Sequence, residues 1–241
     1  MFYHFNELTS TIDEARGGNY SHGDVITAES QTAGRGQRGR TWSAAPGENL
    51  TFSVVLETSF LPAAAQFLLL QTVALSIVDT LAGYGLDARI KWPNDIYIAD
   101  RKICGVLIDH TLGTGGAAGM LSRSGVGIGL NVNQIVFAPE LPNPTSMALE
   151  TGRRLDRTEL LTRLHTRLMQ RVRILKTAVP TTLQAEYHSL LYRRGIPAGF
   201  SLPDGTRLTG TILGTDPDGA LLLATAGTTK KFLFREISFI I

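Results

Sequence analysis

Between residues 89 and 132 the sequence consists of short apolar runs that are separated by turn signals. Pro93-Asn94 and Asp100-Arg101 are such signals, because proline, asparagine and aspartate favour turns over regular structure. The runs predict strands over residues 89–92, 96–99, 103–109 and 125–132. Any fold of this chain must therefore include a β-sheet built largely from this segment.

Helices are predicted before and after these strands in the sequence. Residues 63–81 are largely apolar, which is typical of a helix buried on most of its faces, and further helices are expected at residues 156–177 and 180–192. Near the N-terminus, Thr11 and Glu14 have the spacing of a capping box and open a short helix that stops at Gly17-Gly18. Residues 24–29 and 49–57 are rich in β-formers. The pattern predicts an α+β domain with a mixed sheet flanked by helices.

The composition changes at about residue 195. From there, short β-rich runs alternate with Pro203-Asp204-Gly205 and Asp216-Pro217-Asp218-Gly219, which are hairpin signals. These short strands indicate a small β-barrel appended to the first domain. We therefore expect two domains, at residues 1–192 and 193–241.

The composition excludes several classes of protein. Of 241 residues, 43% are hydrophobic and 18% are charged, which rules out a chain that is disordered as a whole. The net charge of +2 is too small to indicate a nucleic-acid-binding protein. Polar residues interrupt the most apolar stretch, residues 60–82, and the N-terminus lacks the pattern of a signal peptide, so we expect neither a membrane span nor secretion. Cys104 is the single cysteine, which excludes a disulfide scaffold and favours a cytoplasmic protein.

The first motif that can carry chemistry is GRGQRGR at residues 34–40, with three glycines and three arginines in seven positions. Arginine side chains bind carboxylate and phosphate oxygens bidentately, and glycines let backbone N–H groups curl around an anion. The motif follows a predicted strand and is closed by Trp42. It indicates an anion pocket; the alternatives are a solvated basic loop and a loop that contacts nucleic acid.

Two further motifs follow along the chain. KWPND occupies residues 91–95, and Lys102 begins an apolar strand with Gly105 three positions later. A lysine there can point into a pocket and face an oxyanion, although an exposed strand position beside a hairpin turn is the alternative. Residues 127–133, GIGLNVN, lack the third glycine of a dinucleotide fingerprint. Glycine alternation in a strand instead favours close packing against a flat ligand.

In this order, the three motifs resemble the catalytic region of biotin protein ligases. Members of that family have a glycine-arginine loop ending in Trp, then KWPND, a lysine-x-x-glycine strand and a glycine strand ending in Asn. The corresponding residues here are 34–42, 91–95, 102–107 and 127–133. Ser10-Thr11 and Gln31 match further positions of the family. The resemblance covers essentially the whole chain and implies a class II synthetase-like catalytic domain followed by an SH3-like barrel.

The resemblance also implies a reaction in two steps. Biotin and MgATP form biotinoyl-5′-AMP and pyrophosphate, and a lysine of a biotin carboxyl carrier protein then attacks the mixed anhydride. Because a carboxylate and a triphosphate must meet, fixed positive groups are needed. The resemblance assigns catalysis to Lys102, Arg35, Arg38 and Arg40; the biotin site to Ser10, Thr11, Ile12, Gln31, Gly34, Arg35, Gly36, Gln37, Lys102 and Gly105; and the nucleotide site to Arg38, Arg40, Trp42, Lys91, Asn94, Asp95 and Asn131. Magnesium is expected to travel with ATP, and Asp95 is the one protein ligand considered for it.

The sequence departs from the family pattern at two of these positions. Gln37 stands where the loop usually carries arginine, so a charge near the biotin carboxylate is missing and weaker retention of the adenylate is expected. Ile12 replaces a common asparagine. Because the chain begins almost at the catalytic domain, we expect no DNA binding; a homodimer stays open.

Two other functions also stay open. Lys102 and Cys104 are two positions apart on a predicted strand and would share a face, as a lipoyl or octanoyl transferase with a Cys/Lys pair requires. The alternative for Cys104 is a small buried packing residue. The glycine-arginine loop would suit a nucleic-acid-binding module, but few aromatic residues lie near it for base stacking. A requirement for ATP separates the ligase from the transferase, because transfer from a thioester needs none.

Overall fold

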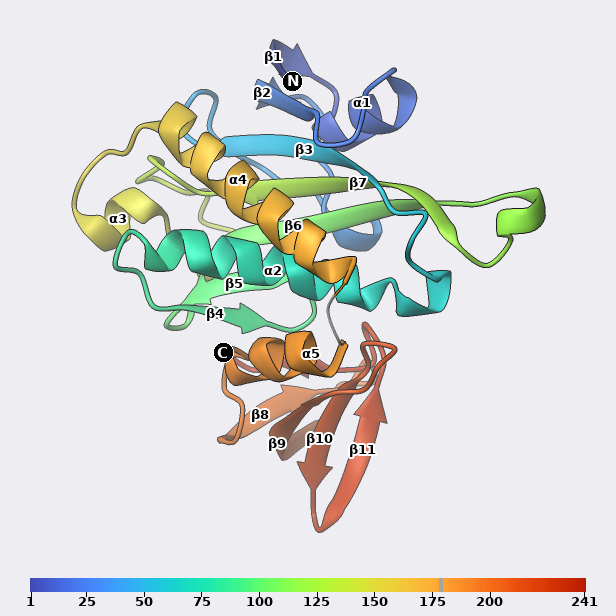
Figure 1. The fold of residues 1–241 in the computed structure, drawn as a ribbon. Coiled ribbons are helices and arrows are strands. Elements are labelled where there is room, and N and C mark those ends of the chain that lie inside the picture. Colours follow the sequence, from blue (N-terminus) through green and yellow to red (C-terminus); the bar gives the residue numbers. More distant parts are fainter. Residues whose placement is uncertain (178–179) are drawn as a thin grey trace.

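The computed structural model describes residues 1–177 and 180–241, apart from the side chain of Arg38. A seven-stranded sheet has the order β1-β2-β3-β7-β6-β5-β4 (Figure 1). Its strands are β1 (Phe2–Leu8), β2 (Val25–Gln31), β3 (Leu50–Glu57), β4 (Ala88–Lys91), β5 (Asp95–Ile98), β6 (Arg101–Leu112) and β7 (Leu121–Leu130). β1 and β2 are parallel and every other neighbouring pair is antiparallel. The predicted mixed sheet is confirmed.

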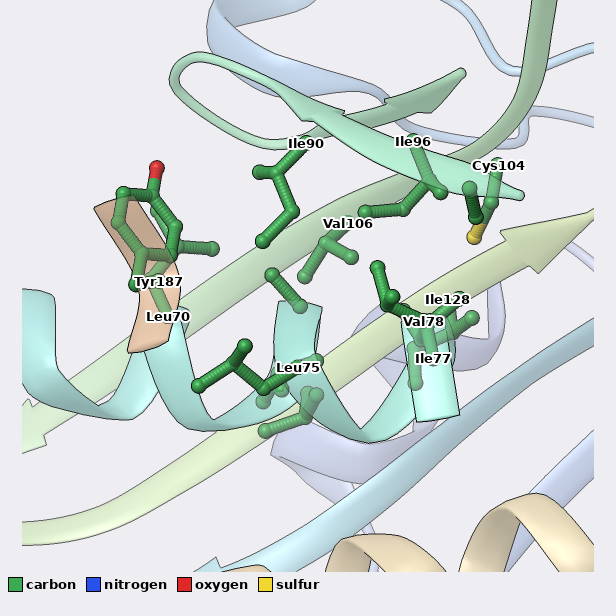
Figure 2. Close-up of a cluster of buried hydrophobic side chains, with 14 of the residues drawn as sticks. Leu70, Leu75, Ile77, Val78, Ile90, Ile96, Cys104, Val106, Ile128 and Tyr187 are labelled. Atoms are coloured by element: carbon green, nitrogen blue, oxygen red, sulfur yellow. The ribbon is translucent and has the colours of Figure 1, made fainter. Parts of the chain in front are cut away.

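Helices α2 (Phe67–Ala82) and α4 (Arg157–Leu175) lie across one face of this sheet (Figure 1). Figure 2 shows apolar side chains of α2 meeting those of β4, β5, β6 and β7; the labelled residues are Leu70, Leu75, Ile77, Val78, Ile90, Ile96, Cys104, Val106, Ile128 and Tyr187. The stretch Ala63–Ala82, which begins with a 3-10 turn before α2, is long and apolar enough to cross a membrane. Most of it is buried inside the protein, however, so packing against the sheet accounts for its apolar composition.

The second face of the sheet carries the short helix α1 (Thr11–Gly17) and the glycine-arginine loop. Side chains alternate between the two faces of a strand. Because Val106 and Ile128 point toward α2, their neighbours lie on the second face. There Gly105 pairs with Gly129, Leu107 with Gly127, and Asp109 with Gly125. A row of glycines therefore leaves room on the second face where α1 and the loop pack.

A β-bulge at the start of β6 decides which of its side chains share a face. Ile96 pairs with Cys104 but Tyr97 pairs with Lys102, so one residue, Ile103, is extra. An extra residue reverses the alternation. Ile103 and Cys104 are consequently both fully buried, whereas Lys102 lies on the second face beside Gly105. The expectation that Lys102 and Cys104 share a face is wrong. Burial also raises the pKa of the Cys104 thiol, which opposes a nucleophilic thiolate.

The C-terminal part forms a second sheet, which is entirely antiparallel, in the order β11-β10-β9-β8-β12. Its strands are β8 (Pro197–Ser201), β9 (Arg207–Thr215), β10 (Leu221–Thr225), β11 (Thr228–Phe232) and β12 (Ser238–Phe239). This sheet is consistent with the predicted SH3-like unit. The strand pairings among the described residues do not close it into a barrel. α5 (Pro180–Ser189) leads into it. The indole of Trp92 donates to the carbonyl of Gly219 at 2.8 Å, which joins the two sheets. The boundary between residues 192 and 193 stays a prediction.

Three local features differ from the sequence prediction. The sequence pattern does not predict β1. It is an edge strand whose residues are all exposed or half-buried, so it lacks the alternation of apolar and polar residues. The pattern also does not predict the short helix α3 (Met147–Thr151). The capping box is also wrong. Ser10 precedes α1 without a side-chain cap, Thr11 accepts a hydrogen bond from Ser53, and the carboxylate of Glu14 accepts one from Tyr20.

Candidate active site

A cavity of about 610 Å³ lies on the second face of the large sheet, at its junction with the C-terminal sheet. Its volume is in the range of small-ligand sites. Predicted site residues in its wall are Ser10, Thr11, Ile12, Gln31, Arg35, Gly36, Gln37, Arg40, Trp42, Lys91, Asn94, Asp95, Lys102 and Gly105. The fold therefore brings the glycine-arginine loop, KWPND, Lys102 and the glycine strand together, although they are far apart in the sequence.

Two predicted site residues are placed differently, and the side chain of a third is not described. Gly34 is buried at the start of the loop, where a Cβ atom would meet the carbonyl oxygen of Trp42 at 2.4 Å. Asn131 is buried and donates from its amide to the carbonyl of Thr145 at 2.9 Å, so it fixes a loop rather than facing the cavity. The side chain of Arg38 lies outside the described part of the chain.

The C-terminal sheet supplies residues that sequence reasoning missed. Phe234, Arg235, Ile237, Ser238 and Phe239 line the cavity together with Thr51 of β3. The family resemblance implied an SH3-like barrel for this segment, but it gave no contact with the site. Residues of both domains thus contribute to the wall of the cavity.

The cavity is strongly cationic. Arg35, Arg40, Lys91, Lys102 and Arg235 contribute to its wall, and Asp95 is the only carboxylate among the lining residues that the structure describes. Several fixed positive charges in a concave site attract ligands that carry several negative charges. A carboxylate and a polyphosphate together are such ligands.

Lys102 is paired with Asp95 inside this cavity. Lys102 Nζ lies 2.6 Å from Asp95 Oδ1 and 5.6 Å from the centre of the Trp42 ring. The bulge in β6 turns Lys102 onto this face, and Asp95 is held opposite Gly105 by strand pairing. The ammonium group therefore has a defined position in the cavity.

Lys91 is half-buried where the two sheets meet. Its Nζ lies 5.2 Å from the centre of the Tyr97 ring and 5.0 Å from that of Phe239. Burial lowers the pKa of Lys91; the Asp95 carboxylate raises it, and the positive charges of Lys102 and Arg40 lower it further. Anions that enter between these three cations would relieve their mutual repulsion.

Trp42 covers the glycines of β6 and β7. A Cβ atom at Gly129 would lie 2.2 Å from Trp42 Cε2, and one at Gly105 would lie 3.1 Å from Trp42 Cζ3. The flat group that the glycine alternation predicted is therefore at least in part the indole of Trp42. Its Nε1 is buried and has no hydrogen-bond partner among the described residues, so a donor is available at the cavity wall.

The end of the cavity next to α1 combines polar groups with an apolar floor. The backbone N–H of Thr11 donates to the amide oxygen of Gln31 at 2.8 Å, which orients that side chain. The hydroxyl of Ser10 is buried and has no partner in the described part of the chain. Ile12 packs on the second face over Gly125 and Gly127. This end suits a ligand that has both hydrogen-bonding and apolar parts.

The comparisons with known proteins agree with this geometry. A model of the biotin/lipoate A/B protein ligase family matches residues 3–127. The chain belongs to this family. The bifunctional ligase/repressor BirA of Escherichia coli is 33% identical over 223 residues, which cover 92% of this chain and 68% of BirA. The biotin–[acetyl-CoA-carboxylase] ligase of Mycobacterium tuberculosis is 30% identical to this chain over 215 residues. The match covers 86% of this chain and 75% of the M. tuberculosis protein.

A solved structure of the family supports the same conclusion for the fold. The biotin protein ligase of Aquifex aeolicus in complex with biotin and ATP is 26% identical to this chain, with a TM-score of 0.84. The match covers 99% of this chain and 98% of the other. The likeness to this structure therefore extends over the C-terminal sheet as well as the seven-stranded one.

The described residues give no protein-only metal site. No group of three or more His, Cys, Asp or Glu side chains among them could hold a metal ion. Of the Asp and Glu residues that the structure describes, only Asp95 lines the cavity, and its carboxylate is bound to Lys102. Mg²⁺ commonly binds through one or two carboxylates plus substrate phosphates, so a single Asp95 fits an ion that arrives on ATP.

Proposed function

We propose that this protein is an ATP-dependent biotin ligase that forms biotinoyl-5′-AMP and transfers the biotinoyl group to a lysine of a biotin carboxyl carrier protein. The meeting of Lys102, the glycine-arginine loop and KWPND in one cationic cavity carries this conclusion. The relatives named as biotin ligases and the neighbour that holds biotin and ATP support it.

In the first step a carboxylate oxygen of biotin attacks the α-phosphorus of ATP, and the bond from that phosphorus to pyrophosphate breaks. The reacting groups are both anions, so their approach needs fixed positive charge. Lys102 lies in the cavity on the floor made by Gly105, and Lys91 and Arg40 are close enough to interact electrostatically. The ammonium has three donors, so Lys102 can bind an anionic substrate while Asp95 keeps its direction fixed. Mg²⁺, when it arrives with ATP, would supply further positive charge at the phosphates.

In the second step the amine of the acceptor lysine attacks the carbonyl carbon of the anhydride. A C–N bond forms, the C–O bond to AMP breaks, AMP leaves with the electron pair, and the amine loses a proton. Negative charge builds on the oxygens around the carbonyl and the α-phosphate. An ammonium at the position of Lys102 stabilises that charge in both steps.

The test is biotinylation of a purified biotin carboxyl carrier domain, followed by mass spectrometry. Biotin plus MgATP should add one biotinoyl group, and omission of ATP should abolish the gain. Lys102→Ala should lose this activity, and Lys230→Ala, which removes an exposed lysine of β11, should keep it. No mass gain with an active reference acceptor would contradict the proposal, and transfer from a thioester without ATP would favour the acyltransferase. The natural carrier, a homodimer, the lack of DNA binding and the cytoplasmic location stay predictions.

A further inference from the structure

Trp92, the second residue of KWPND, contacts the C-terminal sheet at two points. Its side chain is buried, and its indole N–H donates to the carbonyl of Gly219 at 2.8 Å. Its ring meets that of Phe234 edge-on, with the ring centres 5.1 Å apart. Gly219 lies between β9 and β10, and Phe234 lies between β11 and β12. One side chain of the motif therefore contacts two separate connections of the second sheet.

The carbonyl that Trp92 binds belongs to a turn that the C-terminal sheet itself holds in shape. The N–H of Gly219 donates to the carbonyl of Asp216 at 3.0 Å. The carboxylate of Asp216 accepts the N–H of Ala220 at 2.8 Å and pairs with Lys231 of β11. A Cβ atom at Gly219 would lie 2.5 Å from the ring of Phe67, so the backbone of the turn packs directly on α2. A shift of Trp92 relative to this turn is therefore a shift of one sheet relative to the other.

The part of the cavity wall that the C-terminal sheet supplies lies beside these contacts. Phe234, Arg235 and Phe239 line the cavity there, and Lys91, the neighbour of Trp92, has its Nζ 5.0 Å from the centre of the Phe239 ring. Arg235 and Lys91 bring positive charge from both sheets to this end. The end next to α1 is built from other elements and combines polar groups with an apolar floor. The cationic end at the C-terminal sheet thus suits the phosphates of ATP.

We propose that Trp92 is a positioning residue: it holds the C-terminal sheet against KWPND, so that Phe234 and Arg235 stand in register with Lys91 at the nucleotide end of the cavity. This inference rests on the proposed function for ATP as the ligand. The indole N–H is already bound to Gly219, so Trp92 acts through the C-terminal sheet. Groups on two elements bind one ligand well only when their relative position is fixed. Loss of this contact should weaken ATP binding and leave biotin binding unchanged.

Trp92→Phe tests this because it removes the N–H and keeps an aromatic ring for Phe234. The backbone of Ile90 still pairs with Leu190 and Tyr192, so the two parts of the chain stay attached. The loss of one buried hydrogen bond should raise the KM for ATP about 3- to 10-fold, with the KM for biotin and kcat at saturating substrates unchanged.

Tyr3→Phe is the matched control for Trp92→Phe. It removes the contact of an aromatic hydroxyl with Met1 Sδ on β1 and should leave both KM values unchanged. An unchanged KM for ATP in Trp92→Phe would overturn the inference. Equal rises in the KM for ATP and the KM for biotin would also overturn it, because they would show a general loss of structure.

Asp216→Ala reaches the same turn from the C-terminal side and does not alter Trp92. It should also raise the KM for ATP. Asp204→Ala is its control, because Asp204 accepts the N–H of Thr206 at 2.9 Å in another turn of the same sheet. In a Trp92→Phe background, Asp216→Ala should add less than it does alone, since both act through Gly219. Full additivity would show that Trp92 does not act through this turn, and would overturn the inference.

Hydrogen exchange of the substrate-free protein is independent of ligase activity. The backbone amides of residues 216–225 should exchange about 3- to 10-fold faster in Trp92→Phe than in Tyr3→Phe, because the turn opens more often. Equal exchange would contradict the proposed contact between the sheets. A wild-type protein that fails to biotinylate any carrier would overturn the proposed function, whereas the exchange measurement would still test how Trp92 holds the C-terminal sheet.

Discussion

Lys102 Nζ and Asp95 Oδ1 are 2.6 Å apart, so the lysine that the family motif singles out is held by the last residue of KWPND. Two features of β6 create this pair. Strand pairing places Asp95 opposite Gly105, and the bulge at Ile103 turns Lys102 onto the same face as Gly105. The carboxylate fixes the direction of the ammonium and leaves it inside the cavity. The spacing of these residues in the sequence does not predict that they form a pair.

Lys102→Ala should abolish most adenylate formation. It removes an anion-stabilising charge from a partly buried site, and the expected loss in rate is about 100-fold or more. The side chain of Lys102 is 32% exposed, so the melting temperature should change little. Pyrophosphate release measured with biotin and MgATP checks the prediction. Release at nearly the wild-type rate would show that Lys102 does not act on the reacting anions.

Asp95→Asn should lower the rate of adenylate formation by less than Lys102→Ala does. The charge of Lys102 remains, but its direction is no longer fixed, and a loss of about 10-fold is expected from poorer orientation. Because both substitutions act through the same ammonium group, the double variant should be no slower than Lys102→Ala alone. The same pyrophosphate assay decides this, and additive losses would show an independent role for Asp95, such as holding Mg²⁺.

Gly129→Ala should displace Trp42 from the floor of the cavity. The new Cβ atom would lie 2.2 Å from the indole, well inside contact distance, so the ring or β7 must move. We expect weaker binding of ATP and a shift in the emission of Trp42, while Trp92 stays buried between the two sheets. Gly17→Ala is the control, because no atom lies within 4 Å of a Cβ at that position. Calorimetry and fluorescence that are unchanged in Gly129→Ala would place Trp42 elsewhere in solution.

Protonation of His188 should lower the stability of the protein as the pH falls. Its Nε2 accepts the backbone N–H of Thr215 at 2.9 Å and therefore has to be unprotonated in the fold, where it joins α5 to β9. Burial lowers the pKa of His188, and the positive charge of Arg194 lowers it further. The unfolded chain then binds the proton more readily, so this contribution is present above a pH of about 6.5 and is lost below it.

Urea unfolding at pH 7.5 and pH 5.5 measures this effect. The free energy of unfolding should fall toward pH 5.5, and the fall should be smaller in His188→Gln, which cannot be protonated there. A reduced rather than abolished dependence is expected, because burial also lowers the pKa values of His110 and His165. An identical pH dependence of wild type and variant would exclude His188 as a contributor.

The sequence predicted the sheet segments and the motif residues well, because both depend on local pattern. Residues 91–95 and Lys102 were expected at the site and do line one cavity. What could not be predicted depends on register and on long-range packing. The bulge that separates Lys102 from Cys104 was not predicted, since its extra residue, Ile103, suits a regular strand. The contribution of Phe239 requires knowledge of how the C-terminal sheet docks.

Charge pairing was equally invisible to the sequence. Arg35 was expected to meet a substrate anion, but whether Asp13 and Asp109 lie next to it depends on where α1 and β6 cross the loop. Those two carboxylates are 96 positions apart in the chain, as the difference between 109 and 13 gives. A motif identifies residue types that a site needs, whereas their partners come from the fold.

The neutral side chain of Gln37 should make the intermediate escape faster. Gln37 lines the cavity at the position where the family loop usually carries arginine. A charge-assisted hydrogen bond contributes roughly 1.5–3 kcal/mol and a neutral one about 1 kcal/mol. The difference corresponds to about 3- to 30-fold faster release of biotinoyl-5′-AMP. Gln37→Arg should therefore slow that release and scarcely change formation of the intermediate.

The competing possibility is that Arg40, which also lines the cavity, or Arg38 already reaches the same oxygen. Single-turnover release of labelled adenylate from wild type and Gln37→Arg distinguishes the two, because equal off-rates would mean that a neighbouring arginine already supplies the missing charge.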